Sequence, residues 1–497
     1  MDHDSVFESR PLPQAEEKVI KPQDLHLKNG KPPCDYDAAT MAETGSLMTN
    51  NLGDQIVLSN EDTINYRTCS WQMTAALLFS EYICIAIMSF PWSYSVLGLI
   101  PGLLCTVVIA MIVLYTSLTI WRFCLRHPEV RDVCDISKIL FFDSDIVWYI
   151  AAAMFLLNNT FIQALHCLVG AEYLNTVAGQ PFCTVALAMI TAIISFICSL
   201  PRTFSTLSKI GTFSAIATFL SILLSIIFAG IQDHPYGWTE EKGDPMILNF
   251  PAPGTTFVQG LSAFLNISFT FIGQITLPSF ISEMKEPHDF WKSLAAVTVA
   301  EIILFTIVGA LVYVFVGNQY ITSPAFGSLG NDVFMKVSFS FMVPTLIFLG
   351  VLYASVSARF IFFRMFEGTR HKTNHTVFGW ACWSGILLFL WIVAWVIAEV
   401  IPFFTNLLSI MSAIFGSYFG FILWGWAWIR MLYSDHPNLT KKQGLRHWVE
   451  LLFNGIIILI GLFFLGPGTY ASVQSVLDSY KEGGFDSAFS CASNGLH

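Results

Sequence analysis

The stretch CIAIMSFPWSYSVLG, Cys84–Gly98, lies inside the first long apolar run of the chain. A membrane-spanning helix normally continues through such a run, because a free backbone N–H or C=O group finds no water inside a bilayer. Ser89 and Pro91 nevertheless stand near its middle, and proline interrupts the hydrogen bonds of an α-helix. The stretch therefore predicts a helix that is broken at membrane depth, where such backbone must be buried in protein or line a wet cavity.

The composition indicates a membrane protein. Of the 497 residues, 54% are hydrophobic and 12% are charged, whereas a soluble domain carries about 25% charged residues. We expect a polytopic all-α membrane protein with the lipid bilayer around it. The sequence has no basic patch for nucleic acid. Most of the cysteines, Cys183 among them, lie in apolar runs without CxxC spacing, so we expect them to be small buried apolar residues, with no metal site and no cofactor.

The chain divides into two tails and a membrane domain. Residues 1–66 are polar and predict a disordered N-terminal tail. Residues 67–470 predict the membrane domain, and residues 471–497 a short C-terminal tail. A span needs roughly 20 apolar residues, and eleven runs qualify: about 71–99, 101–121, 146–175, 181–200, 205–230, 255–282, 293–317, 332–358, 376–399, 403–429 and 447–467.

The distribution of lysine and arginine orients these eleven spans. If the N-terminus is cytoplasmic, all but three of the 25 basic residues fall on the cytoplasmic side, the exceptions being Lys242, Lys336 and Lys481. Basic residues collect on the cytoplasmic side of membrane proteins. We therefore expect a cytoplasmic N-terminus and an extracytoplasmic C-terminus.

A second stretch resembles the first. The sixth run contains NISFTFIGQITLPSF, Asn266–Phe280, in which Thr276-Leu277-Pro278 repeats the pattern of Ser89-Phe90-Pro91. Broken helices at the same position in two halves are typical of a 5+5 inverted-repeat (LeuT/APC-like) transporter fold, here with broken helices 1 and 6. The positive end of one half-helix attracts a carboxylate and free carbonyl groups accept from an ammonium group, so such a pair suits a zwitterion.

The segments EYICIAIMSFPWSYSVLG in the first run and FIGQ in the sixth resemble the amino acid/auxin permease family, and most of all its fungal neutral amino-acid permeases. The resemblance covers about residues 65–470. It implies secondary amino-acid transport, commonly coupled to protons. In that fold the substrate would lie at the two breaks and the third span, which gives these expected substrate-binding residues: Ile87, Met88, Ser89, Phe90, Asn159, Phe269, Thr270, Phe271 and Gln274.

Three residues are candidates for proton or ion coupling. Glu81 lies in the first run, about two turns before the expected break, and a carboxyl group taken out of water binds a proton more readily; the alternative is a role in helix packing. Ser355 could supply a hydroxyl ligand to sodium, or only allow close packing. Lys209 could stand where a cation sits, or anchor the cytoplasmic end of its helix. Glu301 is a further candidate, whereas we expect Glu172 and Glu399 to be solvated.

The leading hypothesis is symport of a neutral amino acid and a proton by alternating access, because no fixed charge is expected beside either break. Sodium coupling remains an alternative. A second class is a sensor or receptor of the same fold that transports nothing. An enzyme is not expected, since the runs hold no paired carboxylates, HExxH motif or histidine cluster. We expect the plasma membrane, with the vacuolar membrane as the alternative, while the oligomeric state is left open.

Overall fold

The computed structural model describes residues 69–179, 182–202, 205–373, 375–435, 445–481 and 487–496. In these ranges the secondary structure is helical, apart from one isolated bridge between Cys69 and Met284. A helix satisfies its own backbone groups, as a membrane interior requires. The prediction of an all-α membrane protein is confirmed. The N-terminal tail, residues 1–66, lies outside the described residues.

Among the described residues, eight helices are long and apolar enough to cross a membrane, or nine if one bent pair counts as a single span. Two further apolar helices are shorter, α7 (Thr184–Ser199) and α9 (Phe257–Phe271). Each of these helices overlaps one of the eleven predicted apolar runs. The long unbroken helices are α4 (Leu99–Arg126), α6 (Asp145–Ala178), α8 (Ser205–Ile231), α11 (Phe290–Val316), α13 (Val343–Met365) and α15 (Val377–Val400).

Two spans are interrupted. The first consists of α2 (Trp71–Tyr82), the 3₁₀ helix η1 (Ile85–Ser89) and α3 (Phe90–Leu97), and it bends by 50°. The sixth run forms α9 and then, after a gap, α10 (Leu277–Glu283). Both predicted spans are interrupted, the sixth where the sequence predicts it and the first earlier than predicted.

The last two runs change helix type within their length. The first of them contains α16 (Phe404–Met411), a π-helical segment η4 (Ser412–Ile422) and α17 (Leu423–Asp435). The second contains α18 (Leu445–Phe463), a π-helical segment η5 (Phe464–Gly468) and α19 (Thr469–Lys481). This last helix therefore ends at Lys481, beyond the predicted end of the run at residue 467.

Short helices connect the spans, and polar side chains fix where several helices begin. Asp132 accepts hydrogen bonds from the backbone N–H groups of Cys134 and Asp135, and Thr256 and Gln259 form a capping box at the start of α9. Such caps satisfy N–H groups that the first turn of a helix leaves free. The connecting helices are α5 (Val133–Leu140), η3 (Ala325–Ser328) and α14 (Arg370–Thr373), while η2 (Pro287–Asp289) and α12 (Asp332–Ser340) lead directly into α11 and α13.

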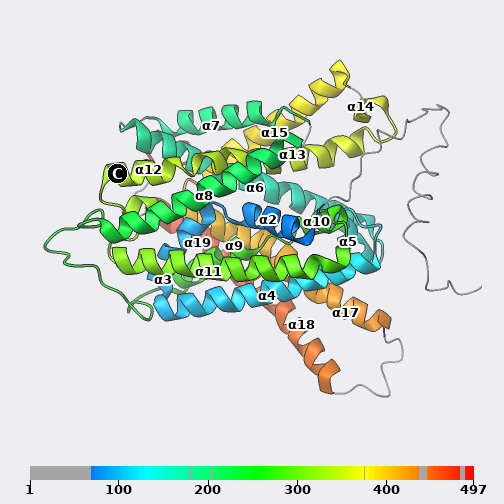
Figure 1. The fold of residues 1–497 in the computed structure, drawn as a ribbon, viewed down its shortest axis with the longest axis horizontal. Helices are drawn as coiled ribbons and strands as arrows, with labels where there is room; N and C mark the ends of the chain where they lie inside the picture. The colour runs from blue at the N-terminus through cyan, green and yellow to red at the C-terminus, as the bar shows by residue number, and fades with distance from the viewer. Residues whose placement is uncertain are drawn as a thin grey trace, which may run out of the picture. The chain divides into compact units, whose positions relative to one another are not determined.

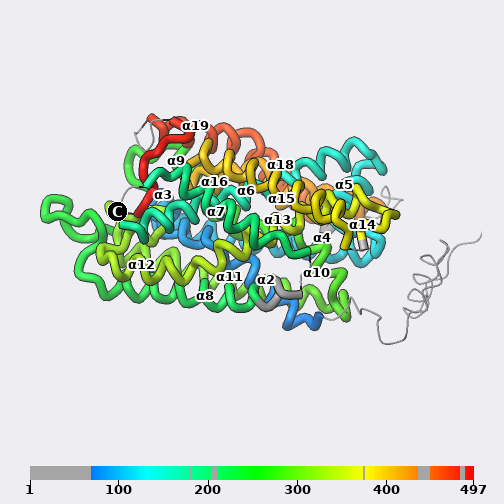
Figure 2. The backbone as a smooth tube through the Cα atoms, turned by 90° about the horizontal axis from the view of Figure 1, so that it is seen from above, coloured from blue at the N-terminus to red at the C-terminus, as the bar shows by residue number. Residues whose placement is uncertain are grey.

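The helices lie side by side and define two ends (Figures 1 and 2). One end holds α3, α19 and the C-terminus, and the other holds α5, α10 and α14. Large apolar side chains point outward along the sides, among them Leu104, Phe389 and Leu459, which are 61%, 66% and 64% exposed. An apolar outer surface of this kind suits contact with lipid.

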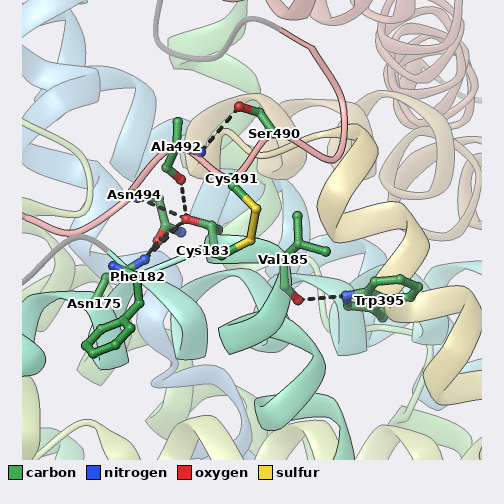
Figure 3. The surroundings of a disulfide bond; sticks show 10 residues. Asn175, Phe182, Cys183, Val185, Trp395, Ser490, Cys491, Ala492 and Asn494 are labelled. Carbon is green, nitrogen blue, oxygen red and sulfur yellow. Dashed lines mark hydrogen bonds between the residues drawn. A yellow bond between two sulfur atoms is a disulfide. The ribbon is translucent and has the colours of Figure 1, made fainter.

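A disulfide joins Cys183, just before α7, to Cys491 in the C-terminal segment (Figure 3). The expectation that Cys183 is an unpaired apolar residue was wrong, because its partner lies 308 residues away and spacing gave no sign of it. Hydrogen bonds hold the same segment. Thr184 donates to the carbonyl oxygen of Ala492 at 2.5 Å, and the side chain of Asn175 donates to that of Asn494 at 2.8 Å.

Candidate functional site

The first break begins earlier than the sequence suggested. Helix α2 ends at Tyr82, Ile83 and Cys84 leave the helical conformation, and the chain then forms the 3₁₀ helix η1 up to Ser89. Pro91 lies in the first turn of α3, where its missing N–H group costs nothing. The non-helical residues are therefore Ile83 and Cys84, about one and a half turns before the expected Ser89.

The second break has the predicted form. Helix α9 ends at Phe271, and Ile272 takes an extended conformation with φ −86° and ψ 92°. Helix α10 starts at Leu277, with Pro278 in its first turn and Thr276 just before it. Residues 272–276 therefore separate two half-helices.

The two broken spans pack against each other. The rings of Phe90 on α3 and Phe271 on α9 contact edge to face with centroids 6.2 Å apart, and Phe305 of α11 lies 5.1 Å from each of them. At the opposite end, the backbone N–H of Cys69 donates to the carbonyl of Glu283, and that of Lys285 donates to the carbonyl of Cys69. The two interrupted spans, although far apart in the sequence, therefore lie in contact in the folded chain.

Glu81 connects both breaks. It is the second-last residue of α2 and only 7% exposed. The hydroxyl of Tyr353 on α13 donates to its Oε1 at 2.9 Å, and the hydroxyl of Thr276 donates to its Oε2 at 3.3 Å. The expectation that no acidic group lies beside a break was wrong, because the first break starts at Ile83, two residues after Glu81.

Polar groups continue from Glu81 along α13 to α6. Ser357 lies one helical turn from Tyr353, and the side chain of Asn159 donates to its hydroxyl at 3.1 Å. Asn158 in turn donates to Asn159 at 3.4 Å. Ser355 on the same helix is buried. The side chain of Lys209 lies outside the described part of the chain, although its backbone belongs to α8.

The expected substrate-binding residues of the first span are all closed off from solvent. Ile87, Met88, Ser89 and Phe90 are fully buried, and the hydroxyl of Ser89 donates to the carbonyl of Ala86 at 2.7 Å. Of these four residues, Phe90 contacts the sixth span, through the ring of Phe271.

In the sixth span, Thr270 donates to the backbone of Asn266 at 3.1 Å, and the amide of Gln274 donates to Thr116 of α4 at 3.0 Å. Phe269 is partly buried. Asn159 remains apart from this group, since its side-chain bonds run within α6 and to α13.

Sequence reasoning missed several residues of this region. Tyr353 was not singled out, although its spacing of four from Ser357 places both on one face of α13. Asn266 is fully buried, and neither polar atom of its side chain has a partner among the described residues. The ring of Tyr82 lies directly against Gly273, which no local pattern could indicate.

Other acidic residues depart from expectation. Glu172 and Glu399 were expected to be solvated, but they are only 8% and 4% exposed, because α6 and α15 pack against each other. Glu301 on α11 is 3% exposed, and its Oε1 has no hydrogen-bond partner in the described ranges. Glu81 differs from these three in having two hydroxyl donors, one from α13 and one from the gap of the sixth span.

Residues 67–474 match the model of a family described as transmembrane amino acid transporter protein. The chain belongs to this family. The match includes both broken spans and the residues around Glu81. This transmembrane amino acid transporter is therefore a multi-pass membrane transporter and not an enzyme.

Fungal relatives agree with the family assignment. The chain is 29% identical over 439 residues to the N amino acid transport system protein of Neurospora crassa, covering 87% of this chain and 90% of the relative. It is 26% identical to a transmembrane transporter of Gibberella moniliformis, covering 88% and 91%. A transmembrane transporter of Fusarium pseudograminearum is 25% identical, covering 88% and 90%.

Proposed function

We propose that this transporter moves neutral amino acids across its membrane by alternating access, together with protons. The observation that carries the proposal is the position of Glu81, a buried carboxyl group of the first interrupted span. It accepts one hydrogen bond from Tyr353 of α13 and one from Thr276 in the gap of the sixth span. An ionisable group inside a membrane marks an ion or substrate pathway by default.

The two breaks would hold the backbone of the amino acid. Half-helix ends present N–H groups to a carboxylate and C=O groups to an ammonium group, so a zwitterion can be bound with few charged side chains. We assign this role to the segment Ile87–Phe90 and to Phe269, Thr270, Phe271 and Gln274. Asn159 on α6 is a further candidate, although its side-chain bonds run to Asn158 and to α13 and not to the breaks. Their burial supports a site that is closed from both sides at once, as alternating access requires.

Glu81 would take up the proton. When it is charged, Tyr353 and Thr276 stabilise it; when it is protonated, these contacts weaken, and the helices that carry them become free to separate. Proton binding would thereby change how tightly the two broken spans are held together. Ser355 and Lys209 remain the candidates for a sodium-dependent mechanism.

The proposed topology has eleven spans in a 5+5 arrangement, in which the short apolar helices α7 and α9 also cross the membrane. The N-terminus would be cytoplasmic and the C-terminus extracytoplasmic. The end with α5 and α14 carries Lys138, Arg370 and Lys372, in line with the preference for basic residues on the cytoplasmic side. The Cys183–Cys491 disulfide lies at the other end and suits an oxidising compartment.

The test is uptake by the purified full chain in proteoliposomes, with radiolabelled neutral, acidic and basic amino acids at acidic and neutral external pH. We expect neutral amino acids to accumulate when the outside is acidic, and accumulation to stop when a protonophore removes the gradient. Uptake that requires sodium and ignores pH would overturn proton coupling, and binding without uptake would overturn transport.

A further inference from the structure

A large cavity opens at the end of the molecule where the C-terminus lies. It has a volume of about 670 Å³ and is bounded by α3, the start of α9, the start of α16 and the end of α19. Pockets that bind small molecules have volumes of about 300–1,000 Å³. The cavity therefore has room for an amino acid together with water.

Opposite charges line one side of this cavity. Asp478 and Lys481 lie on α19, with the Lys481 Nζ 3.3 Å from the Asp478 Oδ1, and Gln474 donates to the same oxygen at 2.8 Å. The side chains of Asp478 and Lys481 are 45% and 71% exposed. Since an exposed ion pair contributes little to stability, a ligand with both charges can replace it at little cost.

Further polar groups line the cavity, and one of them is hydrogen-bonded to α19 itself. Asn406 of α16 donates to Ser479 at 2.8 Å and accepts from Ser475 at 3.0 Å, so its amide is held in a fixed orientation. The capped start of α9, with Gln259, also lines the cavity and provides the positive end of a helix dipole. An anion favours Lys481 and the start of α9, while a cation favours Asp478.

The cavity also reaches α3. Trp92 and Ser95 line it, and both lie on α3, the half-helix that follows the first break. Trp92 is three residues beyond Ser89, which corresponds to about 5 Å along the helix axis. A molecule in the cavity is therefore next to the segment that we assign to central substrate binding.

We propose that this cavity is a second, outer binding site for zwitterionic amino acids, in which Asp478 and Lys481 recognise the two charges before the substrate reaches the breaks. The proposal rests on the proposed function in one respect, namely that the amino acids bound in this cavity are the ones that the transporter carries past the two breaks. It predicts a role in capture, which affects KM, and no role in the transport step itself.

Uptake kinetics of radiolabelled L-leucine and L-alanine test this role. The double variant Asp478→Asn with Lys481→Gln leaves the net charge unchanged, so long-range attraction is preserved. We expect about a fivefold higher KM with an unchanged kcat. Lys242→Gln, in an exposed loop on the same proposed side, is the control and should leave KM unchanged. An unchanged KM in the double variant, or a fall in kcat instead, would overturn the proposal.

A binding measurement separates this proposal from the central site. Thr405 lines the cavity, and the variant Thr405→Cys can be labelled with a membrane-impermeant maleimide. We expect L-leucine to slow labelling, whereas leucine amide and 4-methylpentanoate, which each lack one charge, do not. The protection should vanish when the Asp478 and Lys481 substitutions are added.

Protection that survives these two substitutions would come from a conformational change at the breaks and would refute the outer site. Equal protection by all three compounds would refute recognition of a zwitterion. If the wild-type chain takes up no amino acid at all, the proposed function fails, while the labelling result still decides whether the cavity binds one.

Discussion

The ring of Tyr82 occupies the space that a side chain at Gly273 would need. A Cβ atom at Gly273 would lie 1.9 Å from the Cε1 of Tyr82, far inside van der Waals contact. The last residue of α2 therefore fits against the gap of the sixth span. Glycine at this position is explained by the tyrosine.

Replacing Gly273 with alanine should displace the Tyr82 ring. Overpacking of this kind costs about 1–3 kcal/mol, and we expect a lower thermal midpoint of the purified protein and a loss of most amino acid uptake. Gly260→Ala on α9, in the same span, is the matched control, since a Cβ there meets no atom within 4 Å. If the explanation is right, adding Tyr82→Ala should restore part of the stability that Gly273→Ala removes. A double variant as unstable as the sum of the two single variants would contradict it.

The hydroxyl of Tyr353 should matter through Glu81. Tyr353→Phe removes one donor to the carboxylate, and a hydrogen bond to a charged group contributes about 1.5–3 kcal/mol. Because the charged form of Glu81 loses support, it should bind a proton more easily, and the pH profile of uptake should move to higher pH. Glu81→Gln, which imitates the protonated side chain, should make uptake independent of pH. A pH profile unchanged in both variants would eliminate Glu81 as the proton-binding group.

The sequence predicted those features that depend on local chemistry. Pro91 and Pro278 mark the starts of half-helices, because proline is tolerated in the first turn of a helix, where its missing N–H group would have no partner. Both prolines lie in such a first turn in the structure. The exact start of the first break was missed, since η1 continues a helical path through Met88 and Ser89. Helix α2 ends at Tyr82, nine residues before Pro91, so this proline does not end it.

Contacts between distant residues could not be predicted from one sequence. Tyr353 and Glu81 are 272 residues apart, and Cys183 and Cys491 are 308 apart. The residues of neither pair belong to a common sequence motif, so only the folded structure shows that they are in contact. Burial of Glu172 and Glu399 was missed for the same reason, because closeness to the end of an apolar run does not show which helix covers a side chain.

The disulfide should stabilise the transporter without taking part in transport. Replacing both Cys183 and Cys491 with serine removes a cross-link that closes a long loop, and a disulfide typically contributes about 2–4 kcal/mol. We expect a lower thermal midpoint of the purified double variant, with unchanged KM for any amino acid that the wild-type chain takes up. Cys198→Ser, which replaces an exposed unpaired cysteine, is the control. Equal midpoints for wild type and double variant would show that the cross-link contributes no stability.

Ile272, in the gap of the sixth span, packs against two glycines of the π-helical segment η4. A Cβ at Gly416 would lie 2.8 Å from the Cδ1 of Ile272, and one at Gly420 would lie 3.2 Å from the same atom. π-Helical turns are frequent at functional sites. We infer that this contact transmits movement between the break and the helix formed by α16, η4 and α17.

Alanine at Gly416 should therefore reduce the rate of uptake more than it reduces stability. The flexible end of the Ile272 side chain can move away from the added methyl group in this conformation, but we expect it to need the space beside Gly416 when the transporter changes conformation. We expect kcat to fall about tenfold, which corresponds to roughly 1.4 kcal/mol. Gly455→Ala on α18, where a Cβ meets nothing within 4 Å, is the control. Adding Ile272→Ala should restore kcat in the Gly416→Ala background. If that pair is no faster than Gly416→Ala alone, Ile272 is not the residue through which Gly416 acts.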